Sequence, residues 1–239
     1  MMKSQGRFIL LYIIIGVNLL VGCGRKTAPQ YVIGVSQCSE DIWRDKFNKE
    51  LQMAEYLNDS IQVKLASSND DSKLQTRQIN QMIDEKVDLL VIAPNQLNTI
   101  SPAINRAYDK GIPVIIYDRK ANSNKYTAFI GCDNYAIGKS MGEFIAQKLQ
   151  GKGRVVEIRG LEGSSPALER HRGFMEAMKK YPGMQVVASE AGDWKEESGK
   201  KAMRRILDKT RDFDYVFSHN DRMGWGAYQV VRDKGLARN

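Results

Sequence analysis

The 239-residue sequence is poor in the residues that build metal and redox sites. It contains two histidines, His171 and His219, and its three cysteines form no C-x-x-C pair, so a metal-ligand cluster is not expected. Ser218 and Asp221 lie beside His219, but neighbours on one turn cannot form the nucleophile, base and orienting acid of a hydrolase. No G-x-S-x-G motif is present either. We therefore expect no enzymatic activity, no metal and no cofactor.

Phosphate loops and nucleic-acid motifs are also missing. The small residues at 163–166 do not have the spacing G-x-x-x-x-G-K-[ST], and no lysine follows them. The formal net charge is +8, but the basic residues are spread over the N-terminal segment and in pairs along predicted helices, such as Lys179 and Lys180. Such pairs are typical of solvated helix faces, and no helix-turn-helix or aromatic-rich basic stretch accompanies them. Nucleic acid is therefore not an expected partner.

The N-terminal apolar run is too short for an ordinary membrane span. Phe8 to Val21 covers about 14 residues, against the ~20 that cross a bilayer, and it follows a basic start. This pattern is typical of a secretory signal. Leu20-Val21-Gly22-Cys23 resembles a bacterial lipobox, which implies a lipid on Cys23. We expect residues 1–23 to be a signal and lipobox segment or, alternatively, an uncleaved anchor helix, and residues 24–30 to be a linker.

Beyond the linker, short apolar runs alternate with amphipathic helical segments. The strands are expected at residues 31–36, 61–66, 87–93, 114–117, 127–130, 154–158, 184–188 and 215–218. This alternation predicts an α/β protein with two lobes built on parallel sheets, residues 31–133 and 134–239. Such sheets bind ligands beyond the carboxyl ends of their strands. The sequence ends directly after a helix, so the second lobe is expected to be incomplete.

Cys38 and Cys132 both follow predicted strands of the first lobe. Export would permit a disulfide between them. Two free, half-buried thiols are the favoured alternative.

Candidate binding residues follow the strands of the first lobe. Trp43 begins a helix, where its indole could face a ligand or pack into the core. Asn95 follows the third strand, in a loop where ordinary loop chemistry is the favoured alternative. Asp118 and Arg119 end the fourth strand, where an acid beside a base suits vicinal hydroxyls, with a surface ion pair as the alternative.

The second lobe offers a similar set. Arg170 lies near the start of the helix predicted from Ala167 to Lys180, and Trp194 lies on a strand-to-helix loop. Asn220 and Asp221 directly follow the last predicted strand, and Asp221 is expected to cap the helix after it.

Taken in order, these clusters resemble type I periplasmic sugar-binding proteins of the ribose- and galactose-binding kind. The resemblance extends over essentially all of residues 31–239 and rests on the aromatic loop after the first strand, Ile92-Ala93-Pro94-Asn95, Ile116-Tyr117-Asp118-Arg119, residues 167–174, Asp193-Trp194 and residues 220–224. It implies two Rossmann-like lobes with a sugar between them. It also implies an incomplete hinge, because the family continues with a further strand and a return to the first lobe.

The resemblance assigns a role to each candidate residue. Trp43 and Trp194 would hold the two faces of a sugar ring, one from each lobe. The hydroxyls would bind Asp118 and Arg119 from the first lobe and Arg170 and Asn220 from the second. Asn95 is a weaker match, because the family's usual asparagine aligns nearer Ala93. The loop after the first strand departs from the family, and Asp41 or Glu40 would supply its polar contact.

The function implied is extracytoplasmic binding of a monosaccharide by a periplasmic protein that is held at the membrane by a lipid or an N-terminal helix. The partner would be an ABC permease for uptake or, alternatively, a histidine-kinase transmembrane partner if the chain is the sensor of a hybrid two-component kinase. A third alternative is an interaction module that kept the fold and binds no sugar.

Overall fold

The computed structural model of the protein describes residues 29–237. The predicted signal segment, its Cys23 and most of the predicted linker lie outside these residues. Inside them, the helices are all too short or too polar to cross a bilayer.

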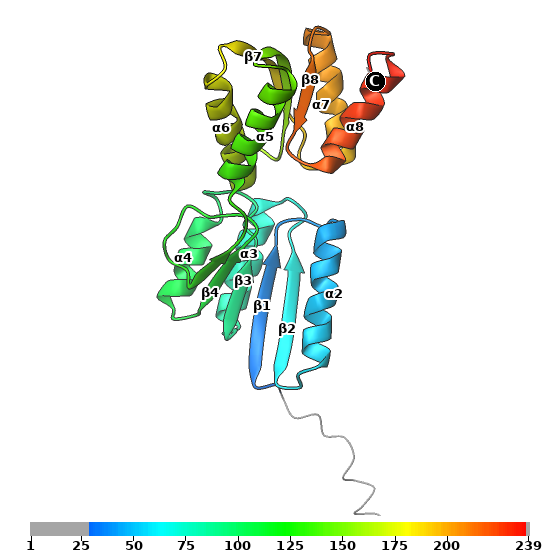
Figure 1. The fold of residues 1–239 in the computed structure, drawn as a ribbon. Coiled ribbons are helices and arrows are strands. Elements are labelled where there is room, and N and C mark those ends of the chain that lie inside the picture. Colours follow the sequence, from blue (N-terminus) through cyan, green and yellow to red (C-terminus); the bar gives the residue numbers. More distant parts are fainter. Residues whose placement is uncertain (1–28, 238–239) are drawn as a thin grey trace, which may run out of the picture.

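Two parallel sheets form the framework, one in each lobe (Figure 1). The first sheet has the order β2-β1-β3-β4-β5, and its strands are β1 (Tyr31–Gln37), β2 (Ile61–Ser67), β3 (Leu89–Ile92), β4 (Val114–Tyr117) and β5 (Ala128–Ile130). The second has the order β7-β6-β8, and its strands are β6 (Lys152–Arg159), β7 (Gly183–Ala191) and β8 (Tyr215–Ser218). All pairs of neighbouring strands are parallel.

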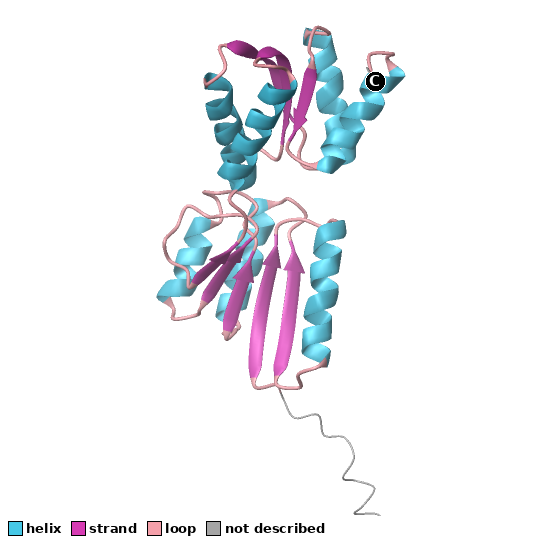
Figure 2. Ribbon diagram, viewed as in Figure 1, coloured by secondary structure: helices cyan, strands magenta, loops and turns pink. Residues whose placement is uncertain are grey.

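Helices connect the strands and cover the sheets (Figure 2). They are α2 (Ile42–Tyr56), α3 (Ser72–Asp84), α4 (Ser101–Asp109), α5 (Asn134–Lys148), α6 (Ser165–Lys179), α7 (Glu196–Lys209) and α8 (Asp221–Asp233). The N-cap of α2 is Asp41, whose side chain accepts a hydrogen bond from the backbone N–H of Arg44.

Alternation along the central strands places helices on opposite faces of each sheet. In β3, Leu90 and Ile92 join the core that α3 and α4 cover, whereas Val91 packs against a separate small cluster to which Phe47 of α2 also belongs. In the second lobe, Val155 of β6 packs with α5 and α6, and Val156 packs with α7 and α8. The fold class predicted from the sequence, two α/β lobes with parallel sheets, is confirmed.

Helices α5 and α6 cross in very close contact, and glycine permits the approach. A Cβ on Gly138 of α5 would overlap the carbonyl oxygen of Arg170, and a Cβ on Gly173 of α6 would overlap that of Tyr135. The crossing therefore fixes where the start of α6, including Arg170, stands relative to α5.

Within residues 29–237 the chain passes between the two sheets once, through residues 131–133. Cys38 and Cys132 are free thiols. The expectation that both are half-buried was wrong, because Cys38 lies in a core cluster at the end of β1 and Cys132 is exposed in the loop after the edge strand β5.

Candidate functional site

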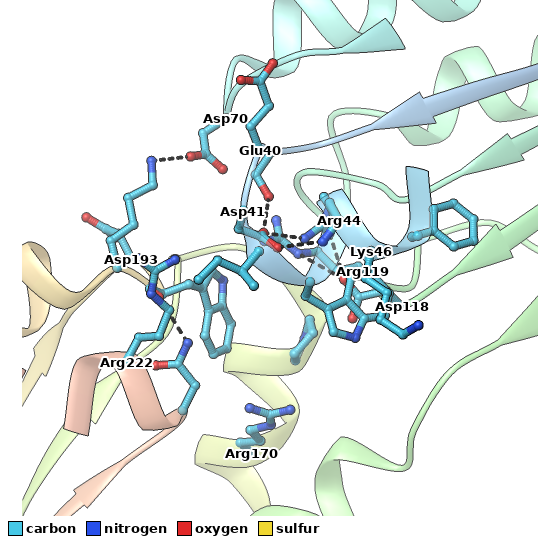
Figure 3. Close-up of a pocket in the computed structure, with 18 of the residues that line it drawn as sticks. Glu40, Asp41, Arg44, Lys46, Asp70, Asp118, Arg119, Arg170, Asp193 and Arg222 are labelled. Atoms are coloured by element: carbon cyan, nitrogen blue, oxygen red, sulfur yellow. Dashed lines mark hydrogen bonds and ion pairs between the residues drawn. The ribbon is translucent and has the colours of Figure 1, made fainter. Parts of the chain in front are cut away.

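A pocket of about 880 Å³ lies between the lobes. Its walls come from the segments that follow β1, β2, β4, β7 and β8 and from the start of α6. Charged side chains from both lobes face it, with Arg44, Asp118 and Arg119 from the first lobe and Arg170 and Arg222 from the second (Figure 3). The carboxyl ends of strands from both sheets therefore converge on one site.

The pocket brings together seven of the eight candidate residues from the sequence. They are Asp41, Trp43, Asp118, Arg119, Arg170, Trp194 and Asn220. Asn95 is the exception, since it is buried and does not line the pocket. Its Nδ2 donates to the carbonyl oxygen of Asp70 at 2.8 Å and to Ser72 Oγ at 2.9 Å, and its own carbonyl oxygen accepts from Arg119 Nη1 at 3.0 Å. Asn95 therefore holds the guanidinium of Arg119 in position from the buried side of the pocket wall.

Arg44 is a lining residue that the sequence analysis did not single out. Its buried guanidinium joins two acids, with Nη1 2.8 Å from Asp41 Oδ2 and Nη2 2.8 Å from Asp118 Oδ2, and it donates to Cys38 Sγ at 3.0 Å. Burial alone would lower the pKa of Arg44, but the neighbouring Cys38, Asp118 and Asp41 outweigh it and raise that pKa. The local sequence signal that pointed to Arg44 was its position three residues after Asp41, which caps the helix.

The ion pair between Arg44 and Asp41 keeps Asp41 ionised. Burial raises the pKa of Asp41, but the hydrogen bond from the Arg44 backbone and the charge of the Arg44 guanidinium outweigh burial, so this pKa is lowered. Asp41 and Arg44 therefore form a charged pair in the pocket wall at neutral pH.

Trp43 lies at the pocket wall and not in the core, since 56% of its surface is exposed. Its ring is stacked with the rings of Phe47 and Tyr117, at centroid distances of 6.3 and 6.4 Å. These neighbours hold the indole in place while much of it stays accessible.

Backbone strain is concentrated around this pocket. Seven described non-glycine residues have a positive φ, and four of them line it, namely Asp70, Asp118, Asp193 and Trp194. At Asp118, the N–H of Arg119 donates to the carbonyl oxygen of Tyr117 at 2.6 Å, which closes a tight γ-turn. Left-handed conformations in non-glycine residues cost free energy and cluster at binding sites.

Arg170 is half-buried, and its hydrogen bonds are all to uncharged groups. Its Nε donates to Asn134 Oδ1 at 3.0 Å and its Nη1 to the carbonyl oxygen of His219, while the guanidinium lies 5.5 Å from the centre of the Trp194 ring. Among the described residues, no carboxylate is within ion-pair distance of it, and burial lowers its pKa. Arg170 thus presents a cationic group to the pocket.

Asn220 fixes the backbone beneath Trp194. Its Nδ2 donates to the carbonyl oxygen of Trp194 at 3.0 Å, and its Oδ1 accepts from the N–H of Met223 at 3.0 Å. Asn220 is therefore the N-cap of α8, and the expectation that Asp221 caps this helix was wrong, because Asp221 is already its first residue.

The lobes touch each other beside the pocket. Lys195 Nζ lies 2.6 Å from Asp70 Oδ2, and both residues line the pocket. Lys120 Nζ lies 2.7 Å from Glu169 Oε1, and the N–H of Lys120 donates to Ser165 Oγ at 2.6 Å. These contacts are few and mostly polar, as in interfaces between lobes that can move relative to each other.

Known proteins resemble the chain in sequence and in fold. The sequence model of a family described as the periplasmic binding protein domain matches residues 33–239. The galactofuranose-binding protein YtfQ of Escherichia coli (strain K12) is 29% identical over 234 residues, which cover 95% of this chain and 73% of that protein. The ribose import binding protein RbsB of Bacillus subtilis (strain 168) is 32% identical over 175 residues, covering 73% of this chain and 57% of that protein.

A solved structure has the same fold at higher identity. It is the fructose binding periplasmic domain of the hybrid two component system BT1754, with a TM-score of 0.82 and 43% sequence identity over 86% of this chain and 68% of that one. The family match extends over nearly all the described residues, and the likeness holds in both sequence and fold. The chain therefore belongs to the type I periplasmic binding protein family.

Proposed function

We propose that the pocket between the lobes binds a monosaccharide outside the cytoplasm. The observation that carries this proposal is the joint presence, at one pocket, of two indoles and of charged side chains from both lobes. Sugars have C–H faces that pack on aromatic rings, and their hydroxyls pair with carboxylates and guanidinium groups. The proposal is supported by relatives whose names refer to galactofuranose, ribose and fructose.

In this proposal each lobe supplies one indole and one set of polar groups. Trp43, Asp118 and Arg119 contact the sugar from the first lobe, and Trp194 and Arg170 contact it from the second. Asp41 and Asn220 act through their neighbours, because Asp41 holds Arg44 and Asn220 holds the backbone of Trp194. Lobe closure then follows from the higher affinity of the closed form for the sugar.

The closed form is what a membrane partner would recognise. We propose a sensor role as the first candidate, because the fructose binding domain of a hybrid two component system is 43% identical, compared with 29% and 32% for the two binding proteins above. Uptake with an ABC permease is the second candidate. Sugar-dependent autophosphorylation of a kinase encoded with this chain supports the first, and sugar uptake that depends on this chain supports the second.

We further propose that the protein is held at the membrane by a lipid on Cys23 or, alternatively, by an uncleaved N-terminal segment that would form an anchor helix. Cells that express the chain are labelled with radioactive palmitate. Label that disappears in Cys23→Ser supports the lipid, whereas an unlabelled protein in the membrane fraction supports the helix.

Isothermal titration calorimetry tests the binding proposal. The purified protein is titrated with D-fructose, D-ribose, D-galactose and L-arabinose, with D-fructose expected to give the strongest signal. Arg170→Met should abolish the heat, because it removes a half-buried cation of the second lobe that faces the pocket without a carboxylate partner among the described residues. If none of these sugars binds, the monosaccharide proposal is wrong, and an interaction module of the same fold becomes the better description.

A further inference from the structure

Glu157 is a fully buried carboxylate that the proposed sugar contacts do not use. It lies on the central strand β6, on the face that packs against α6, because it alternates with Val156 and shares the orientation of Val155. A buried carboxylate costs free energy unless hydrogen bonds satisfy it.

Three donors satisfy this carboxylate. Ser189 Oγ donates at 2.6 Å, His171 Nδ1 lies 2.8 Å from Oε2, and His219 Nε2 lies 3.0 Å from Oε1. Both histidines of the chain therefore meet one acid. Burial raises the pKa of Glu157, but the hydrogen bonds from His219 and Ser189 outweigh burial and lower that pKa, so the group stays ionised.

An ionised carboxylate can only accept hydrogen bonds, and this decides the protonation of His219. Its Nε2 must carry the hydrogen that Glu157 accepts. Burial lowers the pKa of His219, so the ring is neutral and its Nδ1 has a free lone pair. The N–H of Gly160 donates to that Nδ1 at 3.2 Å.

The fixed ring controls two groups at the pocket. Gly160 lies directly against the indole of Trp194, because a Cβ on Gly160 would overlap the indole ring. The ring of His219 is also a neighbour of that indole, at a centroid distance of 6.2 Å. In addition, the carbonyl oxygen of His219 accepts the hydrogen bond from Arg170 Nη1.

We propose that Glu157 is a positioning residue, whose carboxylate selects the tautomer of His219 that holds Gly160 and so sets the places of Trp194 and Arg170 at the pocket. The inference rests on the proposed function only in taking Trp194 and Arg170 as sugar contacts. Glu157 itself does not line the pocket.

Glu157→Gln tests the proposal because it changes hydrogen-bond direction with almost no change in size. The N–H₂ group of the glutamine donates hydrogen bonds, whereas the carboxylate oxygen that it replaces accepted them. When Nε2 of His219 accepts a hydrogen bond from this amide, the imidazole hydrogen must sit on Nδ1. Nδ1 can then no longer accept the hydrogen bond from the N–H of Gly160. Two controls keep the tautomer. Ser189→Ala removes one donor only, and Glu190→Gln on the same strand as Ser189 removes a carboxylate that pairs with Arg205 and Lys209.

Two measurements need no sugar. The ¹⁵N chemical shifts of His219 at about pH 7.5 should show hydrogen on Nε2 in the wild type and a shift toward Nδ1 in Glu157→Gln. In a Trp43→Phe/Trp225→Phe background, where Trp194 is the remaining tryptophan, acrylamide should quench the fluorescence of Glu157→Gln about twofold more strongly. Both controls should match the wild type in both measurements.

The third measurement is D-fructose calorimetry on proteins with their native tryptophans. The dissociation constant should rise about tenfold or more in Glu157→Gln, because an unsatisfied donor beneath Trp194 displaces the indole, and less than about threefold in both controls. A wild type that binds none of the tested sugars overturns the proposed function but leaves the first two measurements to decide this inference. Hydrogen on Nδ1 of His219 in the wild type overturns the inference, even if Glu157→Gln fails to fold. Unchanged quenching in a folded Glu157→Gln also overturns it.

Discussion

Arg44 and Asp118 lie 74 positions apart in the sequence, and Nη2 of the arginine is 2.8 Å from Oδ2 of the aspartate. The same guanidinium binds Asp41, so one buried cation joins the N-cap of α2 to the strained turn after β4. Asp118 is a proposed sugar contact, and its position therefore depends on a residue of a different loop.

Arg44→Met should lower both the affinity for sugar and the free energy of unfolding. The variant leaves two neighbouring carboxylates without their shared cation, and because both carboxylates are partly accessible to water we expect the free energy of unfolding to fall by about 1–3 kcal/mol. The affinity for D-fructose should fall about tenfold or more. Arg106→Met, which breaks an exposed pair with Asp84, is the control and should cost less than about 1 kcal/mol. Urea unfolding and calorimetry measure the two effects, and equal losses in both variants would contradict the role of Arg44.

Trp43 and Trp225 form a matched pair for testing the indole contact. Their exposed fractions are 56% and 54%, and each is stacked on an aromatic neighbour, but Trp225 does not line the pocket. Trp43→Ala should weaken D-fructose binding about tenfold or more, because an apolar face against the sugar is lost. Trp225→Ala should bind as the wild type does. The same loss of affinity in both variants would remove Trp43 from the site.

Alanine substitutions at two helical glycines should have opposite effects on stability, because only Gly173 lies at the close crossing of α5 and α6. Gly173→Ala should lower the free energy of unfolding by about 2–3 kcal/mol, because its Cβ would overlap a backbone carbonyl of α5. Gly224→Ala in α8 should raise it by about 0.5–1 kcal/mol, since its Cβ would meet Ser218 at an ordinary 3.5 Å and alanine favours helix. Urea unfolding followed by circular dichroism tests both signs, and a stabilised Gly173→Ala would show that the helices do not approach so closely.

Stability should fall as the solution becomes acidic, in two stages. The pKa of His219 is lowered by burial, so below pH ~6.5 the unfolded chain takes up a proton that the folded one does not, at up to about 1.4 kcal/mol per pH unit. The pKa values of Glu157 and Asp41 are also lowered in the folded state, so their stabilisation is present above the unfolded values and is lost as pH falls below about 4.5.

Urea unfolding at about pH 7.5, 6.5, 5.5 and 4.5 measures this dependence. His219→Gln should flatten the section between about pH 6.5 and 5.5, because it removes the titrating ring. A wild type that is equally stable at these two pH values would contradict the first stage.

The ion pair between Lys195 and Asp70 joins the lobes, but it is exposed and should contribute little. Lys195→Gln should weaken D-fructose binding by no more than about fivefold and should make the remaining affinity less sensitive to salt. Lys209→Gln removes a lysine that pairs with Glu190 and does not line the pocket, and it should change neither quantity. A loss of more than about a hundredfold in Lys195→Gln would show that this pair is a principal determinant of closure.

The sequence by itself determined the architecture and the neighbourhood of the site. The alternation of apolar runs with amphipathic segments indicates which strands are buried and which face of each helix packs on a sheet. Parallel strands then bring their carboxyl ends to one edge of that sheet. For this reason Trp43 and Asp118 could be placed at one edge of the first sheet from the pattern alone, whereas Arg170 of the second lobe joined them only through the resemblance to sugar-binding proteins.

Only the tertiary structure decided which side chains face the pocket and which support them. Asn95 is a support for Arg119, Asn220 replaces Asp221 as the helix cap, and Arg44 joins the lining. Glu157 lies inside a predicted strand, and the residues next to it in the sequence gave no indication that it would contact His219. These roles depend on strand register and helix crossing over tens of residues, and local periodicity carries no information about such distant pairings.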